Sequence, residues 1–202
     1  MAEAAICRAV RAAAIAVSVV AGAVAIEAAE PASWRIALGD LRITVPLRPG
    51  GAFEARTASL AGTLALASAQ PVVLAGELSV DLATIDTGIA LRNRHLRENY
   101  LELSKGAGFD KAVLTQIRLS EASGEGFEGR SVFEGTLRLH GVSRGVTGSA
   151  EIRREAAGLR VVATFPLTLT DFGIEPPQYM GVGVGNKLIV KVVCVATREA
   201  AR

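Results

Sequence analysis

Alternation of apolar and polar residues with a period of two dominates this sequence. Every odd position from 159 to 169 is apolar, whereas the even neighbours include Arg160, Thr164 and Thr168. Segment 72–81 repeats the pattern with apolar residues or glycine on its even positions. Because successive side chains of a strand point to opposite faces, this period predicts half-buried antiparallel strands.

The same pattern along the rest of the chain predicts an all-β fold. We expect about eight strands, at roughly 34–45, 56–67, 72–82, 112–120, 128–139, 144–154, 158–169 and 187–198. Segment 90–103 contains helix formers and no glycine, and it predicts one short helix. About eight strands with one helix indicate a closed barrel or a sandwich. A barrel of that strand number can hold one small ligand or be filled by its own side chains.

Composition narrows the class of protein further. The chain has 202 residues, half of them hydrophobic and 21% charged, which is typical of one folded domain. A net charge of +2 and an aromatic content of 4% argue against a nucleic-acid partner. With two cysteines and two histidines, the chain has few of the residues that form Cys/His metal sites, so we expect no metal site.

The first 25 residues have the features of a secretory signal. Arg8 and Arg11 precede the uncharged run 12–25, which ends in the small-x-small pattern Ala23-Val24-Ala25. We expect cleavage after Ala25, a linker at 26–33, a barrel domain at 34–198 and a periplasmic or secreted protein. The alternative is an uncleaved N-terminal anchor. Cleavage removes Cys7 and leaves Cys194, which we interpret as a small buried hydrophobe.

Residues that carry chemistry are scarce. No phosphate-binding loop or dinucleotide fingerprint is present, and the glycine-rich run 181–185 precedes a strand, so we interpret it as a loop. The two histidines are His95 and His140, and we expect His140 to be a solvated turn residue. Neither has a partner pattern typical of a triad or a metal site. We therefore predict no catalytic residues, no cofactor and no enzymatic activity.

A dense polar cluster spans residues 85–100. Asp86 and Thr87 have the character of turn or helix-cap residues. Arg92, His95 and Arg97 follow on the predicted helix. They form either a solvated face or a polar rim at the mouth of an apolar cavity, where arginines suit an anionic head group.

Three ordered motifs give the chain a resemblance to a known family. They are Asp86-Thr87-Gly88 followed by Arg92-x-x-His95-Leu96-Arg97, the run from Gly135 to Thr147, and Asp171-Phe172-Gly173-Ile174. Together with the closing strand 187–196, these motifs resemble the YceI-like domain in order and spacing. The sequence departs from that pattern at Asn93, where the family usually has Asp, and at Gly145, which replaces a proline.

The resemblance implies a lipocalin-like, eight-stranded antiparallel barrel in an exported protein. It also implies that a long apolar molecule, a polyisoprenoid or an isoprenoid quinone, binds inside the barrel without reaction. The candidates for the apolar wall are Leu64, Leu74, Leu78, Phe133, Leu137, Val161 and Phe165. The candidates for the polar rim are Arg92, His95, Arg97, Asp171 and Phe172. The alternative is a filled barrel that presents loops to a protein partner, in envelope stress or beside a membrane redox protein.

Overall fold

The computed structural model describes residues 32–120, 128–179 and 181–199. The predicted signal segment 1–25 lies outside the described residues.

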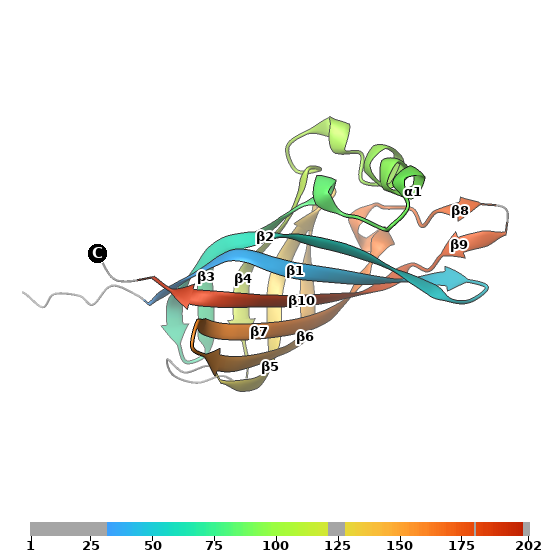
Figure 1. Cartoon of the computed structure of the whole chain (residues 1–202). Coiled ribbons are helices and arrows are strands. Elements are labelled where there is room, and N and C mark those ends of the chain that lie inside the picture. The colour runs from blue at the N-terminus through green and yellow to red at the C-terminus, as the bar shows by residue number, and fades with distance from the viewer. Residues whose placement is uncertain (1–31, 121–127, 180, 200–202) are drawn as a thin grey trace, which may run out of the picture.

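Eight antiparallel strands form a closed barrel, which confirms the predicted fold (Figure 1). They are β1 (Ser33–Arg48), β2 (Ala52–Ala69), β3 (Val72–Asp81), β4 (Lys111–Leu119), β5 (Gly129–Leu139), β6 (Val142–Glu155), β7 (Gly158–Thr168) and β10 (Lys187–Arg198). Each pairs with its neighbours, and β10 closes the barrel by pairing with β1. The glycine-rich run expected to be a loop contains the short strand β9 (Val182–Val184), which forms a hairpin with β8 (Gln178–Tyr179).

The period-two pattern decides which face of each strand points inward. On β5, Ser131, Phe133, Leu137 and Leu139 are buried, whereas the intervening Val132 is exposed. Apolar burial stabilises the barrel by about 25 cal/mol for each Å² removed from water. The inward residues of all eight strands therefore form one continuous core.

The two ends of the barrel differ. We call the end that bears Ser33 and Arg198 the terminus end, and the opposite end the cap end. At the cap end, the connection between β3 and β4 forms η1 (Leu82–Thr84), α1 (Ala90–His95), η2 (Leu96–Tyr100) and η3 (Leu103–Lys105). The turn η4 (Leu169–Phe172) follows β7 at the same end. Figure 1 shows the helical segments and the β8–β9 hairpin together at the cap end, far from the end of β10.

The helix begins where the sequence predicted, but its regular part is shorter. The α-helix ends at His95, and η2 is a wider turn in which the Leu101 N–H donates to the Leu96 carbonyl over 2.8 Å. This wider turn accompanies the burial of Leu101, which is 6% exposed in the core. Glu102 then adopts a left-handed conformation with φ of 50°, which ends the helix.

Candidate functional site: an apolar cavity in the barrel

A cavity of about 170 Å³ lies inside the barrel. All eight barrel strands contribute to its wall, and each described wall residue is aliphatic, aromatic or cysteine. Such a cavity offers contact area and exclusion of water but no charged group for catalysis. It therefore suits an apolar molecule held without a directional hydrogen bond.

Six of the seven predicted wall residues line this cavity. They are Leu64, Leu74, Leu78, Phe133, Val161 and Phe165. Leu137 does not line it, although its side chain is buried, with 6% of its surface exposed. Leu137 lies closer to the cap end than Phe133 on the same strand, where inward side chains pack against one another.

Strand β1 contributes wall residues that the sequence reasoning missed. Trp34, Ile36 and Leu41 line the cavity. Their spacing is irregular because the pairing of β1 with both neighbours shifts register between Arg35 and Gly39. A strict alternation read from the sequence does not follow the inward face across such a bulge.

Two phenylalanines and a glycine shape the middle of the wall. The rings of Phe133 and Phe165 meet edge to face at 90°, with their centroids 5.8 Å apart. Gly148 lies opposite Phe133 on β6. A Cβ atom at Gly148 would come within 2.6 Å of the Phe165 Cβ and 2.7 Å of the Phe133 ring. The absent side chain therefore makes room for this aromatic pair.

Cys194 is part of the wall, as its interpretation as a small buried hydrophobe predicted. Its residue surface is 5% exposed and its thiol is free. Burial raises the pKa of the thiol to about 11 because the thiolate loses its hydration. The protonated thiol at neutral pH behaves as an apolar wall group.

The predicted rim residues of the helical segment lie at the cap end. The Arg92 guanidinium stacks over the Phe53 ring, 4.0 Å from its centroid. Arg97 donates to the Ile85 carbonyl over 3.5 Å, and its buried Nε has no hydrogen-bond partner among the described residues. His95 is exposed. None of these three side chains lines the cavity in the described part of the chain.

The other two rim candidates belong to η4 and also lie apart from the cavity wall. Phe172 is 2% exposed and packs in the core, so its placement at a solvent-facing rim is corrected. Asp171 is exposed, and its backbone carbonyl accepts a hydrogen bond from Arg144 Nε over 3.1 Å. The hydrophobicity of Phe172 accounts for this difference, because it closes the cap end as part of the packed core.

A polar network holds the start of the helical segment. The Asn93 amide nitrogen donates to Asp86 Oδ1 over 2.6 Å, and Asn93 Oδ1 accepts from the Thr87 N–H and hydroxyl. The bond to Asp86 depends on an amide, because an aspartate at position 93 has no N–H to donate. Hydrogen bonds from Asn93 and then from the Gly88 N–H hold the pKa of the Asp86 carboxyl below 3.8. Asp86 closes a local turn by accepting from the Gly88 N–H, and its backbone pairs with Arg56 of β2. Neither Asp86 nor Thr87 caps α1, which Ile89 precedes without a side-chain cap.

His140 joins three segments of the cap end, and its predicted solvation is wrong. Its side chain is 10% exposed. One ring nitrogen lies 2.9 Å from Glu102 Oε2 and the other lies 3.1 Å from the Phe172 carbonyl oxygen. A carboxylate and a backbone carbonyl both accept, so a ring nitrogen that bears a hydrogen donates to its partner. His140 thereby fastens η3 and η4 to the β5–β6 turn.

Other features give no second candidate for chemistry in the described residues. A hollow of about 250 Å³ lies outside the barrel, between the β8–β9 hairpin and Arg48 at the end of β1. In the described part of the chain, no group of three acidic, histidine or cysteine side chains is placed to hold a metal ion. No helix among the described residues is long and apolar enough to span a membrane.

The closed antiparallel barrel with an apolar interior defines the class of protein. The model of the YceI-like domain matches residues 40–196. The chain therefore belongs to the YceI-like family, which confirms the resemblance seen in its motifs.

Solved structures share the fold at low sequence identity. A polyisoprenoid-binding domain from Saccharophagus degradans, implicated in plant cell wall breakdown, is 17% identical with a TM-score of 0.60. That comparison covers 84% of this chain and 99% of the other. BcnA from Burkholderia cenocepacia is 15% identical with a TM-score of 0.59, over 78% of this chain and 96% of the other. No curated protein matches the sequence significantly.

Proposed function

We propose that this protein is an exported carrier that holds an apolar chain inside its barrel, of the polyisoprenoid or isoprenoid-quinone type. The observation that carries the proposal is the cavity of about 170 Å³ with its wholly apolar wall. Each buried CH₂ of a cargo contributes about 0.8 kcal/mol, so binding needs no polar contact in the wall. The polyisoprenoid-binding domain of Saccharophagus degradans has a similar fold and supports this class of ligand.

The proposed role is binding without reaction. The wall contains no acid, base or activated nucleophile among its described residues, and the pKa of Cys194, about 11, disfavours a thiolate. Export to the periplasm or the medium is supported by the signal-like segment 1–25. N-terminal sequencing of the secreted protein tests this part of the proposal, with cleavage after Ala25 as the expected result.

The alternative function is a filled scaffold that presents loops to a protein partner, such as a membrane redox protein. Buried core residues that do not line the cavity, such as Leu137, Leu167 and Leu188, favour it. The cavity itself favours the carrier. The two functions predict different results for a substitution that adds side-chain volume inside the barrel. Such a substitution weakens ligand binding by a carrier and leaves a filled scaffold without such an effect.

A matched pair of substitutions on β6 tests the carrier. Ala150 faces the cavity and is 4% exposed, whereas the adjacent Ser149 is exposed on the outer face. Farnesol binding is followed by the fluorescence of Trp34, the single tryptophan of the chain and a wall residue. We expect Ala150→Leu to weaken binding about tenfold or more, because its three added carbons occupy cargo volume.

Ser149→Leu is the control, with an expected affinity within about twofold of wild type, as for surface changes in general. Circular dichroism establishes that both variants fold. Equal affinities for the two folded variants, or no farnesol binding by the wild-type protein, contradict the proposal.

A further inference from the structure

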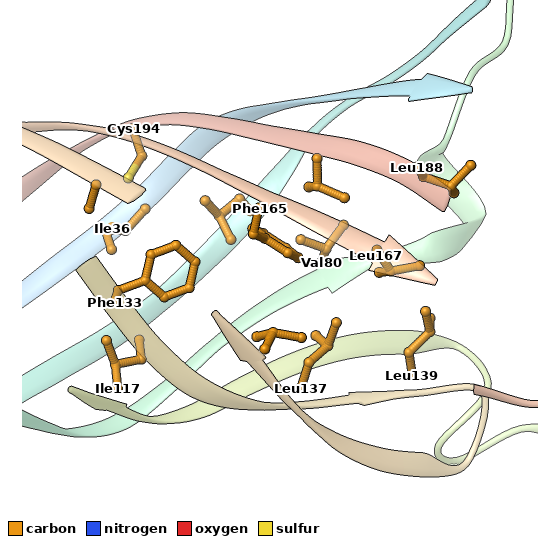
Figure 2. Close-up of a cluster of buried hydrophobic side chains, with 14 of the residues drawn as sticks. Ile36, Val80, Ile117, Phe133, Leu137, Leu139, Phe165, Leu167, Leu188 and Cys194 are labelled. Carbon is orange, nitrogen blue, oxygen red and sulfur yellow. The ribbon is translucent and has the colours of Figure 1, made fainter. Parts of the chain in front are cut away.

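Exposed aliphatic side chains gather at the cap end, outside the barrel wall. Most large hydrophobic side chains of the described residues are buried in the barrel, and Figure 2 shows Phe165 and Leu167 among them. By contrast, Ile89 and Leu91 at the start of α1 are 49% and 52% exposed, and Val182 of β9 is 51% exposed. Figure 1 shows α1 and the β8–β9 hairpin at the same end of the molecule. These three side chains are therefore presented to the surroundings from one end.

Arginines accompany the exposed aliphatic side chains. The Arg92 guanidinium stacks over the Phe53 ring at 4.0 Å, and Arg94 is exposed on the same helix. Arg48 lines the hollow of about 250 Å³ together with Val182. Among the described residues, none of these three arginines forms an ion pair. Their charges can therefore meet an external anion.

The charge around these arginines is positive where it adjoins α1. Residues 89–95 contain two exposed aliphatic side chains, two arginines and an exposed histidine, and no carboxylate. The nearby Glu54 carboxylate lies 3.4 Å from the Arg56 guanidinium. Glu98 and Glu175 are exposed and offset part of the positive charge. Aliphatic side chains next to arginines suit the headgroup region of an anionic membrane, where the phosphates attract the arginines and the aliphatic groups enter the acyl boundary.

We propose that this end of the protein docks on an anionic membrane surface. The docking surface, which we call the cap face, consists of Arg48, Ile89, Leu91, Arg92, Arg94 and Val182. The choice of a membrane as the occupant rests on the proposed function, because a carrier of apolar chains exchanges them with a lipid bilayer. Docking through the cap face does not depend on which end of the barrel the chain enters.

Co-sedimentation of the purified, processed protein with vesicles tests the proposal. We expect the wild-type protein to bind vesicles of phosphatidylcholine and phosphatidylglycerol in equal parts, and to bind vesicles of phosphatidylcholine alone only weakly. A rise in salt from about 0.1 M to about 1 M shortens the Debye length from about 10 Å to about 3 Å. It should therefore release most of the bound protein.

A matched pair of double variants locates the docking surface. Val182→Ser/Arg94→Gln removes one exposed aliphatic group and one charge from the cap face. An arginine near an anionic surface contributes about fivefold to partitioning and the aliphatic group adds to it, so we expect binding to weaken about tenfold or more. Val132→Ser/Arg130→Gln is the control, because it makes the same two changes at exposed positions on β5. Its binding should stay within about twofold of wild type.

Three results would overturn the cap face as a membrane-docking surface. The first is equal binding of the wild-type protein to both kinds of vesicle, or binding to neither. The second is an equal loss of binding in the two double variants, once circular dichroism shows that both fold. The third is self-association of the wild-type protein that Val182→Ser/Arg94→Gln abolishes, without vesicle binding, which would assign the cap face to a second copy of the chain.

Farnesol binding, measured without vesicles by Trp34 fluorescence, separates this proposal from the proposed function. A wild-type protein that binds farnesol but not anionic vesicles contradicts docking and leaves the carrier standing. A wild-type protein that binds anionic vesicles through the cap face but not farnesol contradicts the carrier and leaves the docking surface standing.

Discussion

At the scale of single residues, the inward face of each strand explains why ordinary hydrophobic residues line a cavity. Leu64 and Phe165 are typical strand residues, and only closure of the barrel brings them to one cavity. Cys194 belongs to the same wall. Its burial changes its chemistry as well as its packing, because a thiolate there is poorly hydrated.

The Cys194 thiol should therefore react slowly in the native protein. With its pKa raised to about 11 from a usual 9.0, the thiolate fraction at pH 8 falls about 100-fold. We expect the Cys7→Ser variant to react with a charged thiol reagent about 100-fold more slowly when folded than in guanidinium. A folded rate near that of the unfolded chain would show that Cys194 is not in a dry wall.

Positions in the cavity wall were predicted better than the surroundings of the polar candidates. Alternation identifies an inward side chain, which explains Leu74 and Val161. It does not say which inward side chains pack in the core without lining the cavity, as Leu137 does. The partners of His140 are Glu102 and the Phe172 carbonyl, 38 and 32 residues away. No local pattern reveals such contacts.

At the scale of elements, the cap is held by side chains that cross between segments. The His140 ring bridges Glu102 of the helical connection and η4 after β7. Lys105 adds an ion pair to Glu102 at 2.7 Å. The hydrogen bond from Lys105, and then that from His140, lower the pKa of the Glu102 carboxyl below 4.5.

A lowered carboxyl pKa makes the cap sensitive to acid. Stability from Glu102 is fully present above its unfolded pKa of about 4.5 and is lost as pH falls through the lower folded value. We expect Glu102→Gln to lower Tm by a few degrees at pH 7, and the difference from wild type to shrink as the pH falls below about 4.5. Thermal unfolding followed by circular dichroism measures both.

Glu155→Gln is the control for this comparison, since Glu155 makes a looser, exposed pair with Arg160 at 3.8 Å. Its effect on Tm should be smaller at every pH. A Glu102→Gln deficit that is the same at pH 3 and pH 7 would argue that the carboxylate charge does not fasten the cap.

The limits of the strands were predicted more accurately than the length of the helix, for physical reasons. The strands follow from period two, and β3 and β10 agree with their predicted limits within one residue. The helix was predicted from helix formers at 90–103, but the left-handed Glu102 and the burial of Leu101 shorten it. Those two features depend on packing against the barrel, which propensity does not include.

At the scale of the whole molecule, one barrel combines a continuous buried core with an internal cavity. The core cluster runs along the barrel to η4 and the helical connection at the cap end. Inside the same barrel lies an apolar cavity of about 170 Å³. Leaving such space empty costs stability, because a void forfeits contacts that packed side chains make. A cargo that fills the cavity would restore those contacts.

The central claim is that this cavity carries an apolar chain, and organic-solvent extraction of the purified, processed protein tests it most directly. Mass spectrometry of the extract should find an isoprenoid or another long-chain lipid at about one molecule per barrel, the capacity of a barrel of this size. A blank extract, repeated after incubation with membrane lipids, would contradict the carrier and favour the scaffold that presents its loops to a protein partner.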